Sequence, residues 1–110
     1  EQGAAAFDRL MARPGRPTAV YCGNDVLAVG AKSRARALGL SVPQDVSVVG
    51  FDDIELAQVA YPALTTVHVP HQEMGRRAGQ ALARFLREGQ PIESAKLETR
   101  IILRDTLGPA

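Results

Sequence analysis

The sequence is poor in cysteine and in aromatic side chains, and it has no tryptophan. Of its 110 residues, one is cysteine (Cys22) and 5% are aromatic. A single cysteine excludes an internal disulfide and a zinc site built on cysteines, and it fits a reducing compartment such as the cytoplasm. We therefore expect no disulfide framework. No Gly-x-Gly-x-x-Gly motif follows any apolar run, so a dinucleotide cofactor has no support, and we expect no cofactor and no metal.

The sequence also lacks an excess of either charge and any long apolar run. Thirteen Lys and Arg residues stand against twelve Asp and Glu residues, for a formal net charge of +1. This balance offers little attraction to a phosphate backbone, so we expect no nucleic-acid binding by this chain alone. No apolar run approaches the ~20 residues that span a bilayer, and no secretion leader opens the chain, so we expect no membrane association. Because the first residue is Glu1 rather than Met, we expect a processed or excised piece.

What is present is the composition of a folded protein. Hydrophobic residues make up 45% of the chain and charged residues 23%, which is too apolar for a disordered tail. A length of 110 residues allows one domain with a modest core.

Short apolar runs alternate with segments of helical spacing. The runs are rich in β-branched residues and apolar on both faces, which is typical of buried strands, and such an alternation predicts an α/β fold with a parallel sheet covered by helices. We expect strands at 18–22, 46–50, 64–67 and 100–103, long helices at 4–12, 26–38 and 72–88, and a short helix at 54–60.

The last long helix has two distinct sides at 100° per residue. One side is apolar and is expected to face the core, and the other carries arginines and is interpreted as a solvated face rather than a nucleic-acid patch. The apolar side consists of Met74, Ala78, Ala81 and Phe85, and the polar side of Arg76, Gln80, Arg84 and Arg87.

Polar residues follow three successive predicted strands: Asn24 and Asp25, then Asp52 and Asp53, then His68 and His71. The carboxyl ends of parallel strands share one edge of a sheet, where ligands bind, so we expect these residues to lie near one another.

The roles of these polar residues differ. Asp25 precedes an apolar helical run and is expected to cap it, whereas Asn24 suits a cap and a hydroxyl-bearing ligand about equally. One of Asp52 and Asp53 is expected to cap the short helix, which leaves the other as a carboxylate for a ligand.

Enzymatic and phosphate-binding readings have weak support. His68 and His71 beside the aspartates permit a metal site or an acid/base pair, for instance Asp52 with His71, but their spacing is not diagnostic. Gly30 and Lys32 lack the spacing of a phosphate-binding loop and fall inside a helix.

Three motifs resemble a known family. The segments PTAVYCGNDVLAVGA (17–31), LGLSVPQDVSVVGFDD (38–53) and PALTTV (62–67) closely resemble the effector-binding domain of LacI/GalR transcriptional repressors. The similarity extends from Gly3 to about Thr106.

The resemblance implies a periplasmic-binding-protein-like fold of two α/β lobes with a small ligand between them. Residues 1–110 would form most of the C-terminal lobe, without the helix-turn-helix, the N-terminal lobe and the opening strands. The implied function is a cytoplasmic, dimeric, ligand-responsive repressor and not an enzyme. Its effector would be sugar-like or a purine, and operator DNA would bind to the absent domain. The alternative is a transporter's sugar-binding protein with the same fold.

By position, the resemblance assigns effector binding to Asp52 and Asn24, places Val69 near the ligand, and leaves Asp53 as the cap. It also implies a dimer surface on the second helix and the short helix, consisting of Ala28, Val29, Lys32, Leu56, Val59 and Ala60.

Overall fold

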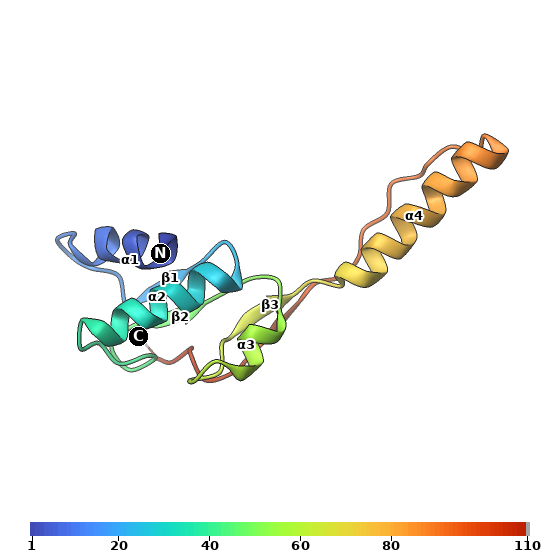
Figure 1. Ribbon diagram of the computed structural model, residues 1–110. Helices are drawn as coiled ribbons and strands as arrows, with labels where there is room; N and C mark the ends of the chain where they lie inside the picture. The colour runs from blue at the N-terminus through green and yellow to red at the C-terminus, as the bar shows by residue number, and fades with distance from the viewer. Residues whose placement is uncertain (110) are drawn as a thin grey trace. The chain divides into compact units, whose positions relative to one another are not determined.

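The computed structural model describes residues 1–109, and its helices and strands follow the predicted order (Figure 1). They are α1 (Gln2–Met11), β1 (Ala19–Tyr21), α2 (Asp25–Ala37), β2 (Ser47–Val49), α3 (Glu55–Val59), β3 (Thr66–His68), α4 (His71–Glu88) and β4 (Arg100–Ile102). The chain forms two compact units: the first comprises Glu1–His68 and the segment from Arg100 onward, and the second is Val69–Thr99.

The strands of the first unit are parallel up to β3, as predicted. β1 pairs with β2 with Val20 opposite Val48, and parallel bridges join Val49 to Thr65 and Asp52 to His68. β4 differs, because it runs antiparallel to β3 with Arg100 opposite His68. The chain leaves the first unit at His68 and returns beside it, so the returning strand must run in the opposite direction.

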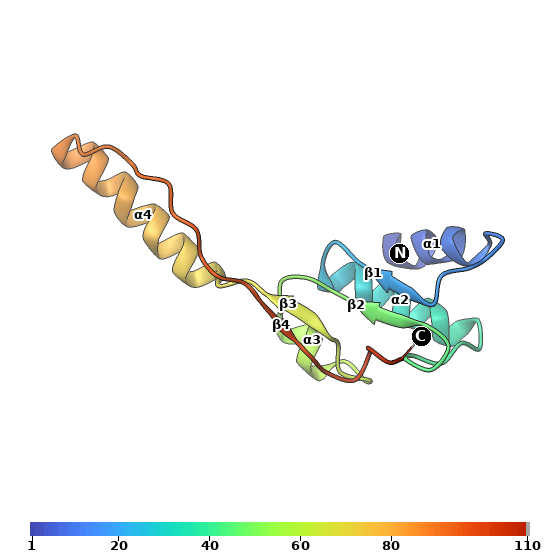
Figure 2. The same ribbon diagram turned by 180° about the vertical axis from the view of Figure 1, so that it is seen from behind.

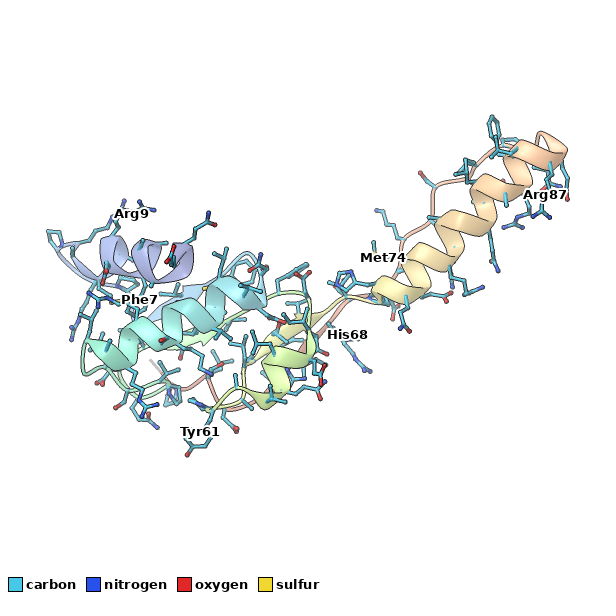
Figure 3. All side chains as sticks on the ribbon, in the orientation of Figure 1. Phe7, Arg9, Tyr61, His68, Met74 and Arg87 are labelled. Carbon is cyan, nitrogen blue, oxygen red and sulfur yellow. The ribbon has the colours of Figure 1, made fainter. Side chains whose placement is uncertain are left out.

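The core of the first unit lies between the strands and their helices. Val20, Val48 and Leu64 are buried, and so is Phe7 of α1. Figures 1 and 2 show α2 over one face of the β1–β2 pair, and α1 packs against α2. Figure 3 shows Phe7 on the side of α1 toward α2 and Arg9 on the opposite side.

Close packing of α1 on α2 depends on a glycine. A Cβ added at Gly3 would lie 2.2 Å from the carbonyl oxygen of Leu27. Across the crossing, Gly30 is an interior residue of α2 whose added Cβ would lie 3.3 Å from the Cα of Gly3. This position agrees with the prediction that Gly30 belongs to a helix rather than to a phosphate-binding loop.

In the second unit, α4 and the segment after it lie side by side. Figures 1 and 2 both show the chain after Gly89 running back along the helix. Every residue of α4 keeps part of its surface exposed, including Met74 (46%), Leu82 (50%) and Phe85 (47%). The side of this helix that was expected to face the core is therefore not buried within the second unit.

The arginine side of α4 is exposed, as expected of a solvated face. Arg76 donates twice to the Glu73 carboxylate, at 2.8 and 2.6 Å, and Arg77 donates to it at 2.6 Å. The hydrogen bond from Arg76 is the main reason that the Glu73 pKa falls to about 2. Within residues 1–109, no helix combines the length and apolar character that crossing a bilayer requires.

Candidate functional site

The loops after β1 and β2 meet β3 at one edge of the first unit, as the parallel order predicts. The amide of Asp25 donates to the Phe51 carbonyl at 2.9 Å, and the amide of Asp52 donates to the Val67 carbonyl at 2.9 Å. These two bonds join the loops to each other and to β3. The predicted clustering of Asn24, Asp25, Asp52 and Asp53 is therefore present.

Asn24, not Asp25, caps α2. Its backbone is extended, and its Oδ1 accepts a hydrogen bond from the Leu27 amide at 2.8 Å. The prediction that Asp25 caps this helix is wrong. Because the Asn24 oxygen already accepts from the helix, the Nδ2 hydrogens are the donors that this side chain can offer a ligand.

Asp25 is a fully buried junction between three segments. Its carboxylate accepts from the Ile54 amide at 2.9 Å and from the Thr66 hydroxyl at 2.5 Å. Space for it depends on Gly50, where an added Cβ would lie 2.2 Å from Asp25 Oδ1. Asp25 therefore holds α2, the loop after β2 and β3 in register.

Asp53 does not cap α3 either. The N-cap position belongs to Ile54, whose side chain has no oxygen to offer. The Asp53 carboxylate instead accepts from Arg104 Nη2 at 2.7 Å and from His68 Nδ1 at 2.9 Å. Burial alone would raise the pKa of this carboxyl, but the bonds from Arg104 and His68 outweigh that effect and lower it. The side chains of Arg104 and His68, rather than helix amides, therefore hold the Asp53 carboxylate.

Asp52 is half-buried and forms a parallel bridge with His68 at the edge of the sheet. Its φ is +106°, in a region that L-residues rarely adopt. A carboxylate accepts hydrogen bonds only, whereas Asn24 has donors to give. The pair is thus suited to an uncharged polar ligand that presents hydroxyl or N–H donors to one residue and an acceptor to the other.

Val69 and His71 belong to the second unit. Val69 is buried, and its carbonyl accepts from the His71 amide at 2.8 Å at the start of α4. The structure therefore places Val69 in a different unit from Asp52 and Asn24. Asp52 and His71, the pair considered for acid/base chemistry, are likewise assigned to different units. In the part of the chain that is described, no three His, Cys, Asp or Glu residues gather as a metal site.

Two residues expected on the dimer surface lie inside the chain. Ala28 has no exposed surface, because it is part of the core. Lys32 is also buried, and its Nζ donates to the Pro62 carbonyl. Burial lowers the pKa of this ammonium group, and Asp105 acts in the opposite direction. Both residues are removed from the predicted surface.

The other predicted surface residues keep exposed area, and so do two residues near them in the sequence. Val29 and Ala60 are partly exposed. Leu56 is 38% and Val59 70% exposed. These two are Val26 at 61% and Tyr61 at 97%, and Figure 3 shows Tyr61 projecting from the first unit.

Arg104 and Thr66 are contributors to the site that sequence reasoning missed. In the sequence, Thr66 is an ordinary strand residue, and Arg104 is a polar residue at the end of a predicted strand. Only the return of β4 beside β3 brings Arg104 to Asp53. The single sequence signal is that Arg104 directly follows an apolar run that starts at Ile101.

Comparison with known proteins identifies the relatives of this chain. Residues 1–107 match the family described as "Periplasmic binding protein-like domain". The HTH-type transcriptional repressor PurR of Escherichia coli O139:H28 is 40% identical over 105 residues, which cover 94% of this chain and 31% of that protein. The chain thus spans about a third of the length of the curated relatives it matches.

Solved structures agree with this relationship. A LacI family transcriptional regulator from Bifidobacterium animalis subsp. lactis superposes with a TM-score of 0.91 at 32% identity, covering 98% of this chain and 40% of that one. The transcriptional regulator CelR in complex with cellobiose superposes with a TM-score of 0.88 at 33% identity, covering 94% of this chain and 32% of that one.

Proposed function

Because the chain belongs to the periplasmic binding protein-like domain family, and within it to the effector-binding domains of LacI/GalR regulators, we propose that it forms the small-molecule sensor of a transcriptional repressor. The observation that supports this most directly is the polar edge where Asp52 and Asn24 follow neighbouring parallel strands. An acceptor and a donor are held there by backbone and side-chain bonds. Operator DNA would bind to a domain outside these residues.

The proposed mechanism is a shift between two conformations of the regulator. An effector that binds one conformation more tightly raises its population, and effector and operator affinities are then coupled reciprocally. The sign of the coupling depends on which conformation the effector favours. A chain with a formal charge of +1 has no role in holding DNA in this scheme.

The proposed effector is an uncharged polar molecule, either sugar-like or a purine. Vicinal hydroxyls or ring N–H groups donate to Asp52, and a hydroxyl or ring acceptor receives a hydrogen bond from Asn24 Nδ2. The cellobiose complex of CelR supports the sugar-like class, and similarity to PurR supports the purine class. Val69 remains a proposed neighbour of the ligand.

The regulator is proposed to be a cytoplasmic homodimer without catalytic activity. Val29, Leu56, Val59 and Ala60, extended by Val26 and Tyr61, supply the exposed apolar area for the contact between subunits. A repressor works where DNA is, which places the protein in the cytoplasm. Asp52 and His71 are assigned no joint chemistry.

Calorimetric titration of the full-length protein tests the site, with cellobiose and adenine as probes. Asp52→Ala removes the acceptor and should weaken binding of the accepted probe at least about tenfold. Asn24→Asp keeps an oxygen to cap α2 but has no donor, so it should weaken binding similarly while thermal stability is retained. Asn24→Ala removes both the cap and the donor. It should therefore weaken probe binding and lower the free energy of unfolding by about 1 kcal/mol.

Asp8→Asn is the matched control, because it breaks the 2.6 Å ion pair with Arg34 away from the site. It should leave probe affinity unchanged. Wild-type affinity in both Asp52→Ala and Asn24→Asp would show that the site is wrong, and failure of every sugar and purine probe to bind would show that the ligand class is wrong.

A further inference from the structure

We propose that Asp53 is a positioning residue that ties the loop carrying Asp52 to the two strands through which the chain leaves and re-enters the first unit. This proposal rests on the proposed function only in taking Asp52 to bind the effector. Its physical content, the restraint of the 50–54 loop, is independent of any ligand.

The loop needs such a restraint because two adjacent residues have left-handed backbones. Asp52 has a φ of +106° and Asp53 a φ of +58°. For residues with a Cβ, such conformations cost of order 1 kcal/mol each, although Asp tolerates them better than most. The surrounding contacts must therefore supply the energy that keeps the Asp52 side chain at the sheet edge.

Asp53 supplies that energy through two hydrogen bonds, one of them from the positively charged Arg104 guanidinium. Its carboxylate is 9% exposed and bridges Arg104 Nη2 at 2.7 Å and His68 Nδ1 at 2.9 Å. Hydrogen bonds to charged groups in such partly buried settings are stronger than neutral ones. Asp53 directly follows Asp52 in the sequence, and the Asp52 amide donates to the Val67 carbonyl.

Arg104 is itself held firmly, so it serves as an anchor rather than a loose counter-ion. Its Nη1 donates to the Leu64 carbonyl at 2.9 Å, and its amide donates to the Thr65 hydroxyl at 3.0 Å. The guanidinium thus joins the start of β3 to Asp53. A lysine ammonium could not reproduce these two bonds, because it lacks the planar, two-pronged set of donors of a guanidinium.

The bridge lies where the chain passes between the units. His68 ends β3 and is the last residue of the first unit before Val69, and Arg100, its partner across β4, begins the return. A change in the direction of the chain where it passes between the units moves His68 and β4. Because His68 is bonded to Asp53, the movement reaches Asp53 and, through the backbone, its neighbour Asp52. Asp53 is therefore placed to couple occupancy of the effector site to the crossing strands.

Hydrogen–deuterium exchange and calorimetry on the full-length protein test the proposal. Asp53→Gly relieves the backbone strain at φ +58° but removes the carboxylate, and Asp53→Asn keeps the shape but removes the charge. Both variants should speed exchange of peptides covering 50–54 about tenfold or more. Both should also weaken binding of cellobiose or adenine, whichever the wild type binds, about tenfold. Asp8→Asn, which breaks an ion pair elsewhere in the first unit, should change neither the exchange of 50–54 nor the affinity for the probe.

Wild-type exchange in both Asp53→Gly and Asp53→Asn would overturn the proposal, because the turn would then need no carboxylate with or without the backbone strain. Equal acceleration in Asp8→Asn would also overturn it, since the effect would be general destabilisation. So would faster exchange with unchanged affinity for a bound probe. If neither probe binds the wild type, the proposed ligand class fails, and local exchange alone decides the role of Asp53.

Discussion

Among the residues of the site, neighbouring aspartates differ in what surrounds them. Asp25 is enclosed and bonded to neutral groups, Asp53 is paired with two basic side chains, and Asp52 lies at the edge. Chemically identical groups therefore take different tasks. Asp25 and Asp53 support the loop, and Asp52, at the edge of the sheet, is the one proposed to bind the effector.

The pairing of Asp53 predicts a pH dependence of stability. Because its pKa is lower in the folded protein than the ordinary 3.8, the pair stabilises the fold fully above the unfolded-state pKa of about 4. That contribution is lost as the pH falls through the lower folded-state pKa. Asp53→Asn should therefore be less stable than wild type by about 1.5–3 kcal/mol at pH 7, and the difference should shrink below about pH 4.

Urea unfolding of both proteins at pH 7, 5, 4 and 3 measures this difference. Asp8→Asn again serves as the comparison, since its side chain is 43% exposed and its contribution should be small at every pH. A difference between wild type and Asp53→Asn that grows on acidification would contradict the pairing.

Among the elements, the crossing of α1 and α2 controls the stability of the first unit. Gly3→Ala should lower the free energy of unfolding by about 1–3 kcal/mol. The new Cβ would fall 2.2 Å from the Leu27 carbonyl oxygen, so the helices must move apart. This cost outweighs the gain of up to about 1 kcal/mol from the higher helix propensity of alanine.

Gly75→Ala is the matched control for this substitution. Gly75 lies in α4, and an added Cβ there meets nothing within 4 Å. It should raise the helix content measured by circular dichroism, because only propensity changes. If Gly3→Ala is also neutral or stabilising, then α1 does not pack on α2 at the described distance.

For the whole molecule, the main feature is apolar surface that the chain does not cover. Leu82, Phe85 and Leu86 of α4 are 47–73% exposed. In the first unit, Val59 and Tyr61 are 70% and 97% exposed. We expect the isolated chain of residues 1–110 to self-associate or to be weakly stable, since exposed apolar area favours association. Sedimentation velocity over a range of micromolar concentrations measures this.

Two variants separate the surfaces involved. Leu82→Gln with Phe85→Gln should reduce association through α4, and Val59→Gln should reduce only the part due to α3. Arg84→Gln, on the arginine side of α4, should leave association unchanged. A wild-type chain that stays monomeric and unfolds cooperatively would contradict the prediction.

The order of the helices and strands followed from the sequence because it depends on local periodicity. β-branched runs such as 46–50 and the amphipathic spacing of 72–88 report their own secondary structure. The gathering of Asn24, Asp52 and Asp53 at one edge followed from parallel strand order alone. The family followed from three motifs in order.

Tertiary structure alone decided the partners of each side chain. A cap and a buried junction use the same residue types, so the sequence could not tell that Asn24 caps α2 while Asp25 bonds Ile54 and Thr66. The burial of Lys32, the return of β4 that brings Arg104 to Asp53, and the division at His68 all depend on contacts between distant segments. Periodicity carries no information about such contacts, because the energy that selects them comes from groups that meet only after the chain has folded.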